Sequence, residues 1–483
     1  MTGAGEVSFG RRLGMLAGEH PERIAAVVER PEDRAISITF AELDHQSNRA
    51  ARMLEARGIG PDARVALALP NSIDWFVACF AIWKLGACVF TIRSDLPAWE
   101  TDRLCEAAQP THALGDLVRP NIPSFPRDVL ADLSAFPADP MSDRIPAPYK
   151  INATGGSTGI PKIVVPNKPG IVSLDGSPQS KLLRLEKGQV QLVVGPLYHY
   201  GPSLNAISGV LDGHTVVTFE RFDARAVMRA IETHRVQIGM LVPTMLYRVL
   251  ELPDIESFDT SSIVRLSIAG AKCPDWVFEK AIDIFGADVL FVGYGGTENV
   301  GIASATAAEW LSHRGTTGRP VQSQFRILDP SGNVLAPGEI GEIWMRPLTG
   351  ISTRYLNAEM PVTDDGFTTL GDIGWLDDDG YLYIADRRRD LIVSGGANIY
   401  PAEVEAALLQ HPAVADAAVV GMIDAEWGAR VHAILIAAGD PVSYEELKRH
   451  CGELLAPYKV PRSAEWRDAL PRDDLGKLRR SAL

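Results

Sequence analysis

Cysteine is scarce in this chain, and its spacing carries little structural information. The 483 residues contain five cysteines, which are Cys79, Cys88, Cys105, Cys273 and Cys451. They form no Cys-x-x-Cys motif and no paired framework, so a disulfide scaffold is not indicated. The distribution favours buried thiols in a reducing, cytoplasmic compartment.

Positive charge is also in deficit, because 47 Lys and Arg stand against 61 Asp and Glu, a net charge of −14. Nucleic-acid binding needs a basic face for the phosphates, so the balance argues against a nucleic-acid partner. An anionic ligand of this protein must therefore be met by local positive charge.

Long hydrophobic runs are absent as well. The most apolar stretch, residues 75–92, is interrupted by Lys84 and Gly86 and is too short to span a bilayer. It predicts a buried helix that leads into a strand. The first residues, Met1 to Glu6, lack the basic start and apolar run of a signal peptide.

The chain is long enough for two or more domains, and its first part predicts an α/β fold. Residues 40–54 have apolar positions at helical spacing, and a short strand is expected at 65–69. Similar helix-then-strand patterns occur at 226–241 and 276–292, whereas 108–147 is expected to be an irregular connection. Helices alternating with strands indicate parallel sheets covered by helices on both faces.

The pattern changes toward the C-terminus. Short strands between Gly and Asp turns at 340–383 predict an antiparallel or barrel-like β part. A small α+β module is expected beyond it, with helices at 401–409 and 444–455 and strands at 415–420 and 431–436. The charged run at 387–390 marks the boundary and, taken alone, is a solvated connector.

The segment Thr154-Gly155-Gly156-Ser157-Thr158-Gly159-Ile160-Pro161-Lys162 is the most informative in the sequence. Glycines let backbone N–H groups surround an anion, while the hydroxyls and the lysine add donors. It is not a Walker A loop, because a proline precedes the lysine and a strand, not a helix, is expected after it. Alone it could equally be a flexible turn.

Four further motifs decide between these interpretations. They are Tyr294-Gly295-Gly296-Thr297-Glu298, Leu370-Gly371-Asp372, the run from Asp386 through Glu405, and Pro471 through Lys477. In this order and spacing the five segments resemble those of the adenylate-forming superfamily, which includes acyl-CoA synthetases, luciferases and the adenylation domains of peptide synthetases. The resemblance covers nearly the whole chain.

The resemblance implies an enzyme that uses ATP and Mg²⁺ to convert a carboxylic acid into an acyl-adenylate and then passes the acyl group to CoA. It implies a large N-terminal domain (1–386), a hinge (387–390) with Arg389 as its pivot, and a small mobile C-terminal domain (391–483). Lys477 would bridge the carboxylate and the α-phosphate, and Lys162 would contact the phosphates. Glu298 would bind the metal, since Mg²⁺ prefers hard oxygen ligands.

The other site residues follow from the same resemblance. The nucleotide would contact Thr154, Gly155, Gly156, Ser157, Thr158, Gly159, Gly270, Ala271, Tyr294, Gly295, Thr297, Asp372 and Arg387. His199 would position the acid in a pocket formed with Tyr198, Tyr200, Val242, Thr244, Gly301 and Ala303, whose small residues suggest a roomy cavity. CoA would pass Gly395, Gly396 and Trp427, although Trp427 could instead be a core anchor.

Two positions depart from the family pattern. Ile163 replaces a usual Gly or Ala and could narrow the space behind the loop, and Leu370 replaces a usual Thr and removes a hydroxyl. The segments at 153–157, 195–199 and 309–315 are similar to those of bacterial synthetases for bulky acids, including bile acids. A carrier-protein acceptor, an enzyme of one half-reaction, and a non-catalytic binding protein remain alternatives, and the oligomeric state is open, a dimer included.

Overall fold

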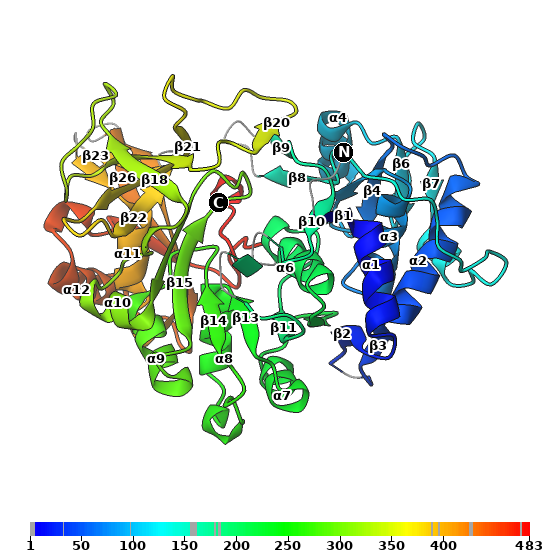
Figure 1. Cartoon of the computed structure of the whole chain (residues 1–483). Helices are drawn as coiled ribbons and strands as arrows, with labels where there is room; N and C mark the ends of the chain where they lie inside the picture. Colours follow the sequence, from blue (N-terminus) through cyan, green and yellow to red (C-terminus); the bar gives the residue numbers. More distant parts are fainter. Residues whose placement is uncertain are drawn as a thin grey trace.

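The computed structural model (Figure 1) describes residues 5–31, 33–96, 98–154, 162–177, 180–181, 185–387, 390–394, 397–424, 428–473 and 476–483. Within these residues, two large mixed sheets flanked by helices form the N-terminal part. A four-stranded antiparallel sheet and a small C-terminal domain follow. The predicted α/β class is therefore confirmed.

The larger of the two mixed sheets has nine strands among the described residues. Its central strands pair in parallel, and the strands at both edges pair antiparallel. Parallel strands in such sheets are buried by helices on both faces, and here the buried Val, Ile and Leu of the strands contact them. In spatial order the strands are β17 (Arg319–Pro320), β16 (Ile302–Thr306), β15 (Leu290–Gly295), β14 (Arg265–Ile268), β13 (Ile238–Leu241), β11 (Val190–Val193), β12 (Thr215–Phe219), β2 (Ile24–Glu29) and β3 (Ile36–Thr39).

The second mixed sheet has seven strands in the described part of the chain, with antiparallel pairing at the end that carries β8 and β9. Residues 108–147, which sequence analysis expected to be an irregular connection, lie in the sequence between parallel strands of this sheet. They contain β6, which pairs with β4. In order the strands of the sheet are β20 (Thr353–Tyr355), β9 (Lys162–Pro166), β8 (Lys150–Thr154), β5 (Cys88–Thr91), β4 (Arg64–Ala68), β6 (His112–Gly115) and β7 (Ser124–Phe125).

The helices begin and end where local sequence signals place them. Thr39 and Glu42 form a capping box at the start of α2, and Ser72 caps α3, whose residues from Trp75 to Lys84 are all buried. The helices are α1 (Phe9–Glu19), α2 (Phe40–Glu55), α3 (Ile73–Lys84), α4 (Ala98–Ala108), α6 (Tyr200–Leu211), α7 (Ala224–His234), α8 (Pro243–Leu250), α9 (Asp275–Phe285), α10 (Ala307–Ser312), α11 (Pro401–Leu408) and α12 (Tyr444–Leu454), with 3₁₀ turns at Arg127–Leu130, Ile255–Ser257, Pro457–Lys459 and Arg480–Ala482.

The antiparallel part predicted near residues 340–383 is confirmed as a four-stranded sheet. Its strands follow the order β18 (Ser323–Leu328), β19 (Gly341–Pro347), β21 (Thr368–Leu376) and β22 (Leu382–Arg387). Two short antiparallel pairs lie outside the larger sheets: β1 (Glu6–Ser8) with β10 (Ile171–Ser173) in the N-terminal part, and β23 (Ile392–Ser394) with β24 (Ala397–Ile399) at the start of the C-terminal domain.

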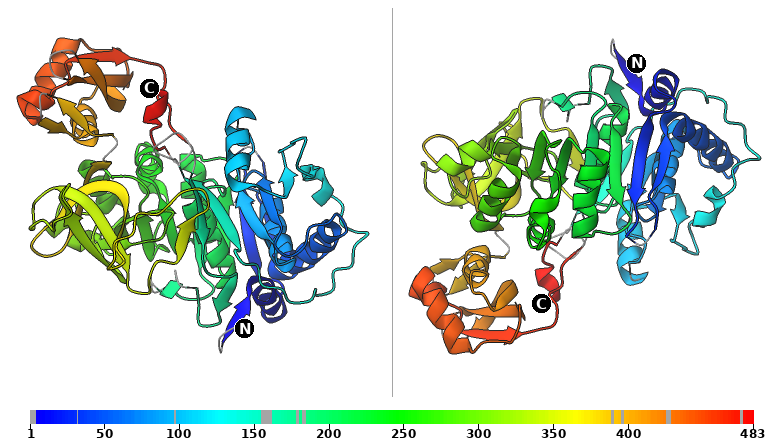
Figure 2. Two further views of the ribbon diagram at one scale, coloured as in Figure 1. Left: turned by 90° about the horizontal axis from the view of Figure 1, so that it is seen from above. Right: turned by 90° about the horizontal axis from the view of Figure 1, so that it is seen from below.

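The C-terminal domain packs α11 and α12 on a sheet of β25 (Val414–Asp424), β26 (Gly428–Ala437) and β27 (Ser463–Trp466), around its own apolar core. Figure 2 shows this domain, orange to red, beside the large N-terminal part. Its last residues return to the green segment, where Gly476 lies against Thr244 of α8. The C-terminal segment therefore docks on the other domain.

Two predictions about the whole chain can be compared with the structure. All five thiols are free, but only Cys79, Cys88 and Cys451 are buried; Cys105 and Cys273 are partly exposed, so the expectation of five buried thiols is wrong for those two. Among the described residues, no helix is both long enough and apolar enough to cross a membrane.

Candidate functional site

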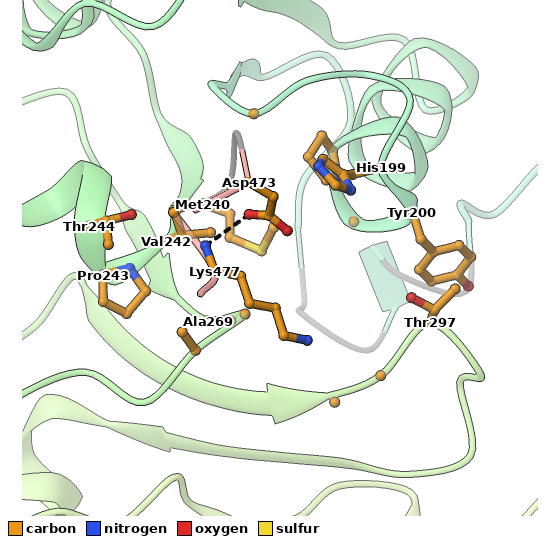
Figure 3. A pocket seen from close by; sticks show the side chains of 18 of the residues that line it. His199, Tyr200, Met240, Val242, Pro243, Thr244, Ala269, Thr297, Asp473 and Lys477 are labelled. Carbon is orange, nitrogen blue, oxygen red and sulfur yellow. Dashed lines mark hydrogen bonds between the residues drawn. The ribbon is translucent and has the colours of Figure 1, made fainter. Parts of the chain in front are cut away.

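A cavity of about 4270 Å³ lies between the two domains and collects most of the predicted site residues. Figure 3 shows its centre, where the side chain of Lys477 extends past Ala269 into the space bounded by Thr297 and by His199 of α6. Residues from the nine-stranded sheet, α6, α8 and the C-terminal segment thus share one cavity.

The predicted phosphate segment is framed by two paired strands. Thr154 at the end of β8 lies opposite Lys162 at the start of β9, so the strands form the two arms of a hairpin. Gly155, Gly156, Ser157, Thr158 and Gly159 lie outside the described residues. Lys162 and Thr154 both line the cavity, as a phosphate site at this edge requires.

Lys162 and Glu298 are linked by Tyr355, a residue that sequence analysis missed. The ammonium of Lys162 lies 4.8 Å from the centroid of the Tyr355 ring, and the Tyr355 hydroxyl donates a 2.8 Å hydrogen bond to Glu298 Oε1. Burial, together with the adjacent Glu298 charge, raises the pKa of Tyr355, so the hydroxyl remains a donor. The signal is weak in sequence, because Tyr355 reaches the site only through the pairing of β20 with β9.

The surroundings of Glu298 fit a magnesium ion. Its side chain is buried, the backbone carbonyl accepts from Thr353, and Oε1 accepts from Tyr355. The described part of the chain contains no cluster of three or more His, Cys, Asp or Glu able to hold a metal alone. Mg²⁺ is commonly bound by one or two carboxylates together with substrate phosphates and water, which agrees with a single carboxylate here.

Two residues that sequence analysis predicted to bind the nucleotide, Tyr294 and Asp372, contact each other directly. The Tyr294 hydroxyl donates a 2.6 Å hydrogen bond to Asp372 Oδ2, and Asp372 lies opposite Arg387 in the pairing of β21 with β22. The bond leaves the ring of Tyr294 in a fixed orientation, edge-on to Phe325. Gly270, with φ of +96°, and Ala271 follow β14 at the same cavity.

Lys477 is held in a tight loop of the C-terminal domain. Its backbone N–H donates to Asp473 Oδ1 (2.8 Å), the dashed line in Figure 3, and Gly476 N–H donates to Asp473 O (2.7 Å). Arg472 donates to Gly476 O and forms a bidentate ion pair with Asp416 of β25. Such pairs give geometric specificity, so the domain presents Lys477 in a defined direction.

The turn at residues 198–200, which sequence analysis predicted to contact the acid, lines the cavity. His199 is the N-cap residue of α6, its ring lies 4.3 Å from that of Tyr198, and both rings line the cavity with Tyr200 and Val242. Burial raises the pKa of Tyr200, with a further contribution from Glu298, so its hydroxyl stays protonated.

Three predicted pocket residues, Thr244, Gly301 and Ala303, line the cavity and also pack against their neighbours. A Cβ on Gly301 would lie 2.8 Å from side-chain atoms of Phe325 and Met345, and Ala303 of β16 is fully buried, so packing also favours their small size. Thr244 contacts Gly476, which makes it part of the docking surface for the C-terminal loop.

The structure describes both residues that depart from the family pattern. Ile163 is fully buried in the apolar core with Phe90 and Val165. Leu370 contacts Gly296 and is partly buried, while the hydroxyl of the preceding Thr369 accepts the Gly371 N–H at 2.9 Å. A hydroxyl is therefore still present in this segment.

Four further predicted residues lie outside the described part of the chain: the pivot Arg389 and the CoA residues Gly395, Gly396 and Trp427. Their roles stay predictions. On the C-terminal side of the pivot, Arg480 pairs with Asp390 at 3.2 Å and with Glu405 at 2.6 Å.

Comparison with known proteins places these observations in one family. Residues 16–356 match the model for AMP-binding enzymes, and residues 403–477 match the model for the C-terminal domain of AMP-binding enzymes. The 2-succinylbenzoate–CoA ligase of Bacillus licheniformis is 32% identical over 96% of this chain and 99% of its own length. The long-chain-fatty-acid–CoA ligase FadD13 of Mycobacterium tuberculosis is 30% identical over 95% of each chain.

Solved structures of o-succinylbenzoate-CoA synthetase (MenE) from Bacillus subtilis have the same fold. Its complex with the acyl-adenylate intermediate has a TM-score of 0.84 at 30% identity, covering 99% of this chain and 98% of that one. Its complex with ATP and magnesium ion has a TM-score of 0.81 at 29% identity, covering 99% of both. A double mutant of the same enzyme, bound to a CoA product analogue, has a TM-score of 0.69 at 30% identity, covering 99% of this chain and 98% of that one. The chain belongs to the AMP-binding enzyme family and is an adenylate-forming acyl-CoA ligase that uses ATP, Mg²⁺ and CoA.

Proposed function

We propose that this ligase activates a bulky hydrophobic carboxylic acid, with Lys477 as the residue that stabilises the adenylation transition state. One observation carries the assignment: a lysine of the C-terminal domain lies in the N-terminal cavity, between the Thr297 side and the His199 side. A cation at that point can contact a carboxylate and the α-phosphate together.

In the first step, a carboxylate oxygen of the acid attacks the α-phosphorus of ATP, and pyrophosphate leaves. Negative charge grows on the phosphoryl oxygens, and a positioned ammonium stabilises it. Lys162 neutralises the phosphates, Glu298 holds the magnesium ion that balances their charge, and Asp372 accepts hydrogen bonds from the ribose hydroxyls. His199 and Tyr200 orient the carboxylate.

In the second step, the thiol sulfur of CoA attacks the acyl carbonyl carbon, and AMP leaves. We propose that the C-terminal domain reorients first, because Lys477 occupies the cavity here. Two structures of MenE from Bacillus subtilis support this. The TM-score of this chain is 0.84 against the acyl-adenylate complex and 0.69 against the complex with the CoA product analogue, at the same sequence identity and coverage. The orientation described here is thus closer to the adenylate state.

Replacing Glu298 by Gln tests the metal assignment. The amide keeps the shape and the contact with Tyr355, but it loses the charge that a hard cation prefers. We expect kcat/KM for Mg·ATP to fall about 100-fold, the loss to shrink as magnesium is raised, and the melting temperature to change little. Tyr355→Phe is the companion variant, with a smaller loss of the same kind. Activity near that of the wild type across the magnesium titration would make Glu298 structural.

Replacing Arg389 by Pro tests the hinge. Proline fixes φ near −65°, and a hinge must absorb large changes in φ and ψ. We expect adenylation to survive and thioester synthesis from supplied acyl-adenylate to collapse. Both rates should be measured on protein confirmed as folded by circular dichroism. Unimpaired thioester synthesis would place the pivot at another residue.

The acid class is tested with a panel of fatty, aryl and polycyclic carboxylic acids, scored by acid-dependent ATP–pyrophosphate exchange. The proposal expects the highest kcat/KM for bulky polycyclic acids, and a preference for short aryl acids would contradict it. Adding CoA or a phosphopantetheinylated carrier protein to the best acid then identifies the acceptor. Faster transfer to the carrier protein would favour the alternative acceptor.

A further inference from the structure

Lys150 is a buried lysine that belongs to none of the five motifs. It lies on β8 with only 3% of its surface exposed, and its ammonium donates a hydrogen bond to Ser203 Oγ of α6. The same ammonium lies 5.6 Å from the centroid of the Tyr200 ring. The lysine thus contacts the first turn of the helix that begins at His199.

The charge of Lys150 has no carboxylate partner among the described ion pairs. Lys84, which is buried to a similar extent, has Asp44 at 2.7 Å. Near Lys150 the ionisable groups are the Cys79 and Cys88 thiols, and burial raises the pKa of both, so they are neutral at pH 7. Burying an ammonium without an anion is unfavourable and favours the neutral amine, so the charge state of this lysine depends on its surroundings.

The hydrogen bonds of Ser203 connect the lysine to the turn at residues 198–200. Ser203 Oγ lies 2.5 Å from the backbone carbonyl oxygen of His199 and 3.0 Å from that of Tyr200, and its single proton can be donated to either. The neighbouring carbonyl of Tyr198 accepts from Thr91 at 2.9 Å. Polar groups on two strands, Lys150 of β8 and Thr91 of β5, therefore hold the turn at residues 198–200.

We propose that Lys150 is a positioning residue for the acid substrate: acting through Ser203 and the face of Tyr200, it holds the turn at residues 198–200, and its positive charge favours binding of the acid's carboxylate there. This inference rests on the proposed role of that turn as the acid-binding end of the cavity. It adds a residue that no motif of the chain predicts.

The charge of Lys150 changes in the physiological pH range. Burial lowers its pKa to about 7, so the side chain is charged below that pH and neutral above it. The groups that face it are Cys79 of α3, Cys88 of β5, and Ser203 and Tyr200 of α6. None is anionic near pH 7, so the KM for the acid should rise as the pH passes through 7.

The test measures KM for the acid and for ATP from pH 6 to 8.5 in three enzymes. For the wild type we expect the KM of the acid to rise about fivefold to tenfold across this range, as the loss of one partly screened charge contact predicts. Lys150→Met should have the high value at every pH, with the KM for ATP within about twofold of normal. Ser203→Ala should raise the KM of the acid at all pH values and keep the inflection, because the lysine still titrates.

Lys84→Met is the matched control, since it removes a buried lysine that does not reach the cavity. It should lower the melting temperature and leave both KM values and the inflection unchanged. Equal changes in the KM values for acid and ATP in Lys150→Met, or an inflection that persists in it, would overturn the proposal. If Lys150→Met does not fold, an unchanged KM of the acid in Ser203→Ala would overturn it. A wild type without acid-dependent adenylation would instead refute the proposed function.

Discussion

Lys477→Ala is expected to abolish adenylation and to leave the second half-reaction largely intact. Losing a charge contact made in the transition state typically raises the barrier by about 3–4 kcal/mol, which corresponds to a loss of roughly 10²–10³ in kcat. Thioester formation from supplied acyl-adenylate should stay within about threefold of the wild type, because that step takes place after Lys477 has left the cavity. Single-turnover assays of each step make the measurement.

The matched control is Lys448→Ala, which removes an exposed lysine of α12 in the same domain. It should leave both half-reactions unchanged. Equal losses of adenylation and thioester synthesis in Lys477→Ala would count against the assignment, because they would indicate a general defect of the domain.

Gly476→Ala is expected to have a comparable effect for a steric reason. A Cβ at this position would lie 2.1 Å from Thr244 Oγ1 and 2.7 Å from Thr244 Cβ, and the backbone φ is +74°. Left-handed backbone disfavours alanine by about 1–2 kcal/mol, and the overlap adds to this in the docked orientation. We expect adenylation to fall at least 100-fold, with thioester synthesis from acyl-adenylate preserved.

A double-mutant cycle isolates this contact. Thr244→Ala removes Oγ1 and Cγ2, the other atom at 2.7 Å, so Gly476→Ala should lose less activity in that background than in the wild type. Gly452→Ala is the control, because its site on α12 is open and no atom lies within 4 Å of the added carbon. Additive effects of the Gly476 and Thr244 changes would show that the two residues do not meet during adenylation.

Much of the fold could be predicted because local signals and the global packing agree. The helix expected at 40–54 is α2, which ends at Glu55, and the strand expected at 415–420 is the middle of β25. Capping residues and apolar periodicity set those bounds. The strand β6 was missed because its four residues lie in a proline-rich and aspartate-rich segment, and only pairing with β4 selects the strand.

The site was predictable where a motif carries the chemistry in adjacent residues. Tyr294 and Asp372 were predicted separately for the nucleotide, and the structure joins them by a hydrogen bond. Tyr355 and Lys150 could not be predicted, because their roles depend on contacts across sheets. Gly301 was assigned to the pocket because it is small; it lines the cavity, and close packing against Phe325 and Met345 also requires a small residue. Small residues in a sequence do not reveal which neighbour requires them.

The order of the chemistry is tested most directly by acid-dependent exchange of labelled pyrophosphate into ATP, with purified wild-type protein and no CoA. Our account predicts exchange that requires both the acid and magnesium, followed by release of one AMP and one acyl-CoA per acid when CoA is added. Exchange that needs CoA from the start, or ATP binding without exchange for every acid in the panel, would contradict an acyl-adenylate formed with Lys477 in the cavity.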